Sequence, residues 1–148
     1  MASITGGDKL AARLREIAER LKTGTEVRAG FLEGATYPDG TPVATVAAVQ
    51  EWGAPSKGIP PRPFFRKVIK GEDAKTWGPT LNALLKQTDM DAARALDTLG
   101  QVIVGQIKQS IKDTSSPPNA PSTIARKGFN KPLIDTAVML NSVDHEVK

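Results

Sequence analysis

The chain has 148 residues, of which 39% are hydrophobic, and its formal net charge is +4 at pH 7. This length and composition predict a single domain, residues 1–148, with a core of ordinary size, and the absence of cysteine excludes disulfide bonds, thiolate metal sites and cysteine nucleophiles. No apolar run approaches the roughly 18 residues of a membrane-spanning helix, and residues 1–7 lack the pattern of a signal peptide, so we expect a soluble protein made in the cytoplasm.

The positive charge is concentrated in two segments without acidic residues, 52–71 and 114–134. The first contains five basic residues and the second three, which leaves twelve bases and sixteen acids in the rest of the chain. These segments are either solvated loops or surfaces that face an anionic partner, such as an acidic protein or DNA.

Residues 8–24 are predicted to form an amphipathic helix, with Asp8 in position to cap its start and Gly24 ending it. Its apolar stripe has helical spacing and consists of Leu10, Leu14, Ile17 and Leu21. Residues 25–32 then change to a period of two, which predicts a half-buried strand.

A turn or loop is expected at residues 34–40, which contain a Pro-Asp-Gly sequence. Thr41 and Pro42 then suit the N-cap and the first position of a helix that ends at Trp52, before Gly53. The β-branched residues of this segment leave a strand as the alternative for its first half.

Three prolines, Pro60, Pro61 and Pro63, follow a flexible link at residues 54–58. Each proline fixes φ near −65° and removes an amide donor, so this stretch is predicted to be a stiff, extended elbow. A short helix should follow and end at Gly71, with Phe64, Phe65, Val68 and Ile69 on its apolar face.

A further helix is predicted at residues 77–87, beginning near Pro79. Residues 89–113 contain the longest periodic pattern, which indicates a helix that forms the spine of the fold. Its apolar stripe consists of Leu96, Leu99, Ile103, Ile107 and Ile111.

The C-terminal third is predicted to contain one or two helical turns at residues 122–127 and an alternating segment at 142–147. The alternating segment is suited to an edge strand paired with residues 25–32. The elements together predict an α+β fold, in which helices pack on a small antiparallel sheet and proline-rich interaction loops project at residues 54–63 and 114–132.

No pattern in the sequence is typical of an enzyme. His145 is the only histidine, no histidine and carboxylate spacing of a metal site surrounds it, and there is neither a G-x-S-x-G motif nor a phosphate-binding loop. We therefore expect no catalytic, cofactor-binding or metal-binding residue.

Two motifs carry a resemblance to a known family. The first is Glu51-Trp52-Gly53 followed by Ile59-Pro60-Pro61-Arg62-Pro63-Phe64-Phe65-Arg66, and the second is the run of residues 119–128 followed by Lys131-Pro132-Leu133-Ile134-Asp135-Thr136. In this order they resemble the tail-completion or neck proteins of long-tailed double-stranded DNA bacteriophages. The second motif departs from the family in having Ala137 where glycine is common, and this argues against a turn with φ > 0 there.

The resemblance implies a virion structural protein that acts as a tail-completion, tail-terminator or head-tail joining subunit. Such a subunit would form a homo-oligomeric ring, a hexamer in preference to a dodecamer, through which DNA passes. Its other partners would be neck, portal-adaptor and tail-tube proteins, its location the virion after synthesis in the host cytoplasm, and its helices would pack on one face of a short sheet.

We expect the elbow and the second basic segment to contact neighbouring subunits. The predicted interface residues are Trp52, Ile59, Arg62, Phe64, Phe65, Arg66, Arg126 and Lys127, and the predicted DNA-channel residues are Lys57, Lys67, Lys127 and Lys131. The alternatives are that the aromatic side chains belong to the core or stack on bases, and that the arginines pair locally with Glu51. The alternative function is a small nucleic-acid-binding protein without sequence specificity, whose basic residues contact phosphates.

Overall fold

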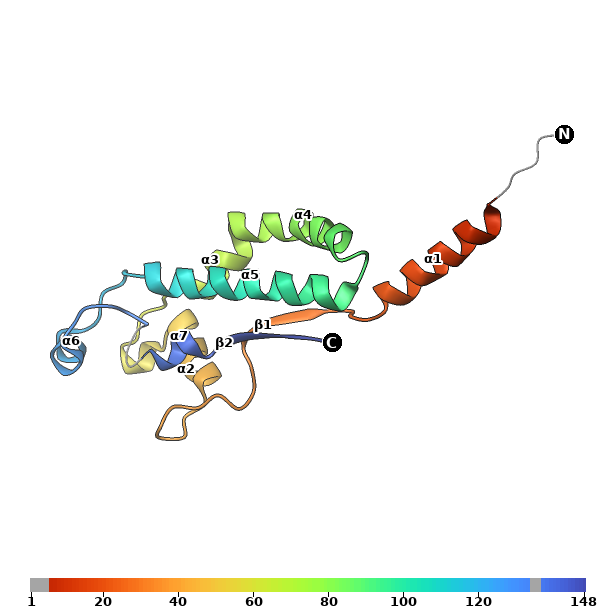
Figure 1. The fold of residues 1–148 in the computed structure, drawn as a ribbon. Helices are drawn as coiled ribbons and strands as arrows, with labels where there is room; N and C mark the ends of the chain where they lie inside the picture. Colours follow the sequence, from red (N-terminus) through yellow and green to blue (C-terminus); the bar gives the residue numbers. More distant parts are fainter. Residues whose placement is uncertain (1–5, 134–136) are drawn as a thin grey trace.

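A two-stranded antiparallel sheet and one long helix form the framework of this α+β fold (Figure 1). The computed structural model describes residues 6–133 and 137–148. Its elements are α1 (Gly7–Leu21), β1 (Val27–Phe31), α2 (Val43–Trp52), the 3-10 helix η1 (Pro55–Lys57), α3 (Phe64–Lys70), α4 (Glu72–Gln87), α5 (Ala92–Asp113), α6 (Pro121–Lys127), α7 (Val138–Asn141) and β2 (Val143–Val147).

The sheet joins the two ends of the chain. Val27 of β1 lies opposite Val147 of β2, and Phe31 lies opposite Val143. The amides of residues 25 and 26 extend the pairing by donating to the carbonyl oxygen of Lys148. The prediction that residues 142–147 form a strand paired with residues 25–32 is therefore confirmed.

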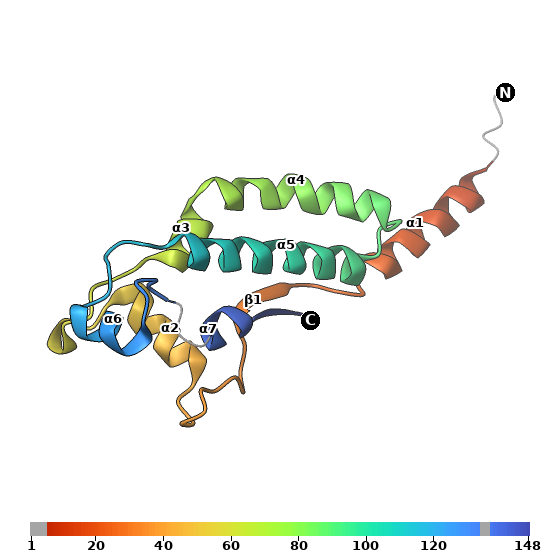
Figure 2. The same ribbon diagram turned by 60° about the vertical axis from the view of Figure 1, so that its left-hand side comes forward.

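Helix α5 packs along the sheet, and α3 and α4 pack against α5 (Figure 2). Its N-cap is Asp91, whose side chain accepts a hydrogen bond from the Arg94 amide at 3.1 Å. The helix begins after the predicted position because Asp89 and Met90 have φ values of 53° and 64°, which no α-helix accommodates. All five residues of the predicted stripe are buried, so the prediction of a central helix is confirmed.

Helix α4 begins at Glu72, five residues before the predicted start, and Pro79 lies inside it. Gly71 separates α3 from α4, and acidic residues occupy the first turn of α4, where the helix dipole favours them. Trp77 of α4 donates a hydrogen bond from Nε1 to Oε1 of Gln106 in α5 at 2.7 Å. Tertiary packing of this kind offsets the helical hydrogen bond that is lost because Pro79 has no amide donor.

Three local predictions at helix ends are corrected by the structure. Gly6, with φ 101°, precedes α1 as its N-cap, so Asp8 lies in the first turn instead of at the cap. Pro42 is the N-cap of α2, one residue later than predicted, and the whole of residues 43–52 is helical. Ala137 has φ 59°, so the left-handed conformation that its side chain disfavours is nevertheless present at the start of α7.

Candidate partner-binding surface

The proline-rich elbow and the segment after α5 are joined by the side chain of Arg62. Its Nε donates to the carbonyl oxygen of Pro117 at 2.9 Å, and its Nη2 donates to that of Pro118 at 3.0 Å. Its Nη1 donates to Oε1 of Gln50 in α2 at 2.9 Å. The two basic segments, predicted as separate projections, are therefore attached to each other and to α2.

Two predicted interface residues lie inside the subunit. Arg62 is only 5% exposed, and burial lowers the pKa of its guanidinium. Phe64 is 1% exposed and packs edge-on against Phe31, with ring centroids 6.1 Å apart. With so little surface exposed, neither side chain is the exposed partner contact that the sequence predicted, and Phe64 contributes only to the wall of the groove described below. Phe64 instead fits the alternative of a core residue.

Glu51 organises the start of α3. Its carboxylate is buried and accepts hydrogen bonds from the amide of Phe65 at 2.9 Å, the amide of Arg66 at 3.1 Å and Nε of Arg66 at 2.7 Å. This arrangement is the local ion pair considered from the sequence, and Arg66 makes it, whereas Arg62 does not. The carboxylate oxygens thereby pair backbone amides that would otherwise lack an acceptor at the start of α3, whose N-cap residue provides no side-chain hydrogen bond.

The Arg66 guanidinium lies 4.0 Å from the centre of the Trp52 ring. Trp52 is 64% exposed, so it is not a core residue. Because Glu51 fixes the guanidinium on one side, the exposed ring and its cation are held in one orientation. A preorganised aromatic and arginine pair of this kind is typical of an interface anchor.

An apolar groove opens beside this pair. It has a volume of about 280 Å³ and runs between β1 and α2. Residues of β1, three alanines of α2 and the aromatic side chains of Trp52, Phe64 and Phe65 line it. We call this feature the α2 groove.

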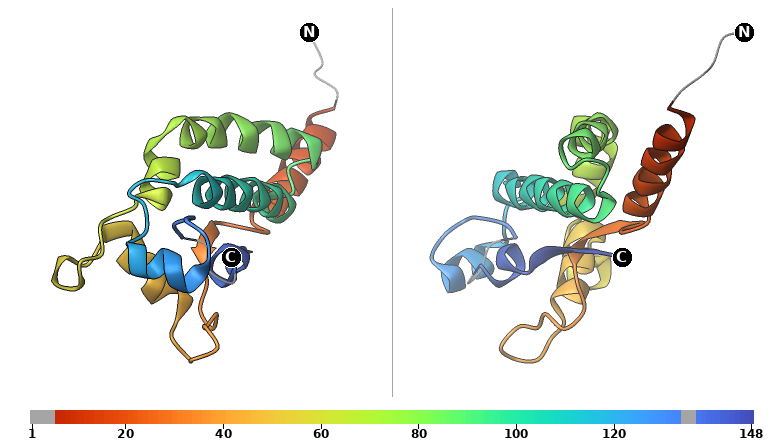
Figure 3. Two further views of the ribbon diagram at one scale, coloured as in Figure 1. Left: turned by 90° about the vertical axis from the view of Figure 1, so that its left-hand side faces the viewer. Right: turned by 45° about the vertical axis from the view of Figure 1, so that its right-hand side comes forward.

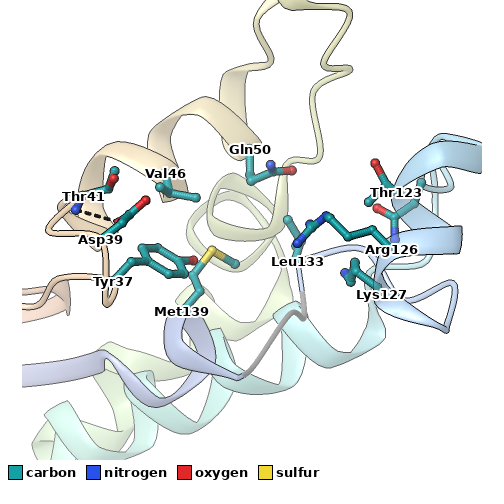
Figure 4. A pocket seen from close by; sticks show the side chains of 11 residues that line it. Tyr37, Asp39, Thr41, Val46, Gln50, Thr123, Arg126, Lys127, Leu133 and Met139 are labelled. Carbon is teal, nitrogen blue, oxygen red and sulfur yellow. Dashed lines mark hydrogen bonds between the residues drawn. The ribbon is translucent and has the colours of Figure 1, made fainter.

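A second hollow, of about 290 Å³, lies between α2 and the segment that carries α6 (Figure 4). Val46, Leu133 and Met139 contribute apolar walls, while Arg126 and Lys127 come from α6. Two of the predicted interface residues, Arg126 and Lys127, therefore lie near the edge of α2. Asp39 and Thr41 lie on the opposite side of the same hollow.

The predicted channel lysines lie on three separate parts of the chain, since only Lys127 and Lys131 are neighbours. Lys57 is exposed in η1, in a short loop closed by hydrogen bonds between the backbones of Ala54 and Ile59, and this pairing leaves Ile59 half-buried. Lys67 borders a hollow between α3 and α5. The Lys127 ammonium donates to the carbonyl oxygen of Lys131 at 2.8 Å and lies 5.0 Å from the centre of the Phe129 ring.

Some residues of this surface carry no signal in the sequence. Gln50 and the carbonyl groups of Pro117 and Pro118 are ordinary in type, and only the folded chain brings them to Arg62. The second half of the second motif, residues 134–136, lies outside the described residues.

No group of three or more histidine or carboxylate side chains suited to a metal ion occurs in residues 6–133 and 137–148. His145 is bound by its Nε2 to Oδ1 of Asp97 at 2.8 Å, and this hydrogen bond holds the pKa of Asp97 below its ordinary value. Over the same residues, no helix is both long and apolar enough to cross a bilayer. Comparison of the chain with models of known families, with curated proteins and with solved structures found no match.

Proposed function

We propose that this protein is a structural subunit of the neck or tail end of a long-tailed bacteriophage, where it assembles as a ring through which DNA passes. The proposal is supported by the Trp52 and Arg66 pair, an exposed anchor oriented from below by a buried carboxylate. It is supported further by the resemblance of the two motifs. The first motif contains this pair, and the second directly follows residues 117 and 118, to which Arg62 attaches the elbow.

The contacts within the subunit suit a protein that assembles through a preorganised surface. Arg62 ties the elbow to residues 117 and 118 before any partner binds, so less conformational entropy is lost on docking. Ring closure needs a heterologous contact, in which two different surfaces of the subunit meet. The anchor pair and the basic segment with Arg126 provide two such surfaces, and catalysis has no place in this role.

The test is a phage that carries the gene for this chain with Trp52→Ser. We expect separate heads and tails in electron micrographs, with purified Trp52→Ser showing the same helical content as the unaltered protein. Val102→Ser is the matched control, since Val102 is an exposed apolar residue on α5, away from the anchor pair. Normal joining by Trp52→Ser particles would refute the proposed role of this surface.

Nucleic-acid binding is the competing function, and one observation counts against it. Arg62 and Arg66, two of the eight bases in the two basic segments, are occupied by groups of their own subunit. Fluorescence anisotropy with a labelled DNA duplex separates the two functions. A steep fall in the logarithm of the binding constant with the logarithm of salt concentration, corresponding to several phosphate contacts, would favour the nucleic-acid-binding protein. An absence of binding at low salt would favour the structural subunit.

A further inference from the structure

Helix α1 has an apolar stripe that its own subunit does not cover. Leu10 is 62% exposed, Leu14 56% and Leu21 42%, and Ile17 is half-buried. The helix projects from the end of the molecule, at an angle to α5 and away from α2 (Figure 3). A stripe at positions i, i+4, i+7 and i+11 is the anchor pattern of a helix that binds in a groove.

The polar side of α1 fixes its direction. Arg13 and Arg20 both pair with the carboxylate of Asp89, in the turn between α4 and α5, and Glu16 pairs with both arginines. Residues 13, 16 and 20 lie on one side of the helix, and the apolar stripe is roughly a quarter turn away from them. The ion pairs therefore hold the helix while leaving its stripe free.

The connection from α1 to β1 keeps the helix from turning back onto its own body. The amides of Thr25 and Glu26 are bonded to the carbonyl oxygen of Lys148, and the Thr23 hydroxyl accepts a hydrogen bond from the Ala93 amide. Gly24 is tightly packed, since a Cβ atom there would lie 3.0 Å from Cα of Ala93. With this linker fixed, α1 cannot reach the α2 groove of the same copy.

The α2 groove is matched to such a helix in chemistry. The only charged side chain in α2 is Glu51, which is buried and paired, so the outer side of α2 offers no charge to an incoming helix. Ala44 and Ala48 are exposed and line the groove, and their small side chains permit close approach of a second helix. Trp52 stands exposed at the end of α2.

The groove and the stripe also match in length. The ten residues of α2 extend over about 15 Å, and the twelve residues from Leu10 to Leu21 extend over about 18 Å, at 1.5 Å per residue. Three of the large hydrophobic side chains exposed in residues 6–133 and 137–148 belong to the stripe, and another borders the groove.

We propose that α1 of one copy of this chain docks in the α2 groove of a second copy, with its leucines against the alanines of α2 and the ring of Trp52. The contact joins two different surfaces, so it repeats from copy to copy and closes when the rotation between copies permits a ring. The inference concerns the purified chain and does not depend on the viral role. Trp52 belongs to both surfaces, but the tests below leave it unaltered, so their outcome is separate from that of the Trp52→Ser phage.

The chain contains no cysteine, which permits a direct test by disulfide cross-linking. Purified Leu14→Cys and Ala48→Cys proteins, each with one thiol, are mixed and oxidised, and mass spectrometry identifies the mixed dimer. The matched control replaces Leu14→Cys with Arg15→Cys, whose side chain is exposed on the other side of α1. We expect at least tenfold more mixed dimer from Leu14→Cys than from Arg15→Cys.

A second measurement covers the case in which the thiols alter the contact. Light scattering of the unaltered chain should show a concentration-dependent oligomer, and Leu10→Ser with Leu14→Ser should show a monomer of unchanged core stability. Equal cross-linking by the two cysteine positions would overturn the proposal. Binding of α1 to lipid vesicles without the 14–48 disulfide would assign the stripe to a membrane surface and overturn it as well.

Discussion

The guanidinium of Arg62 donates a hydrogen bond to the carbonyl oxygen of Pro117 across 55 positions of the sequence. The bond places a charged side chain that is only 5% exposed between the elbow and the segment that follows α5. Because a buried charge without partners is strongly destabilising, the three acceptors around it lock the two segments together. The relationship makes Arg62 a structural residue beneath the proposed partner surface.

Replacement of this arginine should release the segment. Arg62→Met removes the donor to three acceptors, and we expect a loss of about 2 kcal/mol in the free energy of unfolding. Arg62→Lys should recover little of this free energy, because a single ammonium does not reproduce the planar set of donors of the guanidinium. Urea unfolding measures the loss, and proteolysis within residues 114–132 should become faster. Lys57→Met, at an exposed position, is the control, and equal proteolysis of the two variants would contradict the prediction.

Gly100 permits α5 to lie against the sheet. A Cβ atom there would overlap the His145 ring and come within 2.9 Å of Val27. We expect Gly100→Ala to lower the free energy of unfolding by roughly 1–3 kcal/mol through overpacking. Gly105→Ala, on the same helix but with open space around it, should raise it by about 1 kcal/mol through helix propensity. Thermal unfolding of both variants checks the difference in sign.

Ala137 adopts the left-handed conformation at the start of α7, with φ 59° and ψ 11°. Since a Cβ atom costs roughly 1–2 kcal/mol in this region, Ala137→Gly should stabilise the fold by about 1 kcal/mol. Ala83→Gly, at an exposed position inside α4, should instead destabilise it by about 1 kcal/mol. Chemical denaturation measures both, and a loss of stability in Ala137→Gly would count against the strained conformation.

The hydrogen bond between His145 and Asp97 predicts a pH dependence. The folded chain holds the pKa of Asp97 below its ordinary value of 3.8, chiefly through the His145 side chain. A depressed carboxyl pKa stabilises the fold above the ordinary value, and this stabilisation is lost as the pH falls through the folded value. Urea unfolding between pH 6 and pH 3 should therefore show a smaller acid-induced loss for Asp97→Asn than for the unaltered chain. Parallel curves for the two proteins would contradict this assignment.

Hydrophobic spacing by itself determined most of the helices and both strands. The stripe from Leu96 to Ile111 specifies α5, and the alternation in residues 25–32 and 142–147 specifies β1 and β2 together with their pairing. These patterns are local consequences of the periods of 3.6 and 2 residues. Gly53 and Gly71 likewise mark helix ends. Gly53 has φ 77°, which other residues resist, and a Cβ atom at Gly71 would overlap the carbonyl oxygen of Lys67.

The tertiary structure alone decided which residues form a surface. Arg62 and Arg66 look equivalent in the sequence, yet one is buried against residues 117 and 118 while the other lies beneath an exposed tryptophan. Pro79 and Ala137 also take conformations that their local preferences disfavour. The physical reason is that burial and the satisfaction of buried charges depend on contacts between residues distant in the chain, and these contacts outweigh local preferences of about 1–3 kcal/mol.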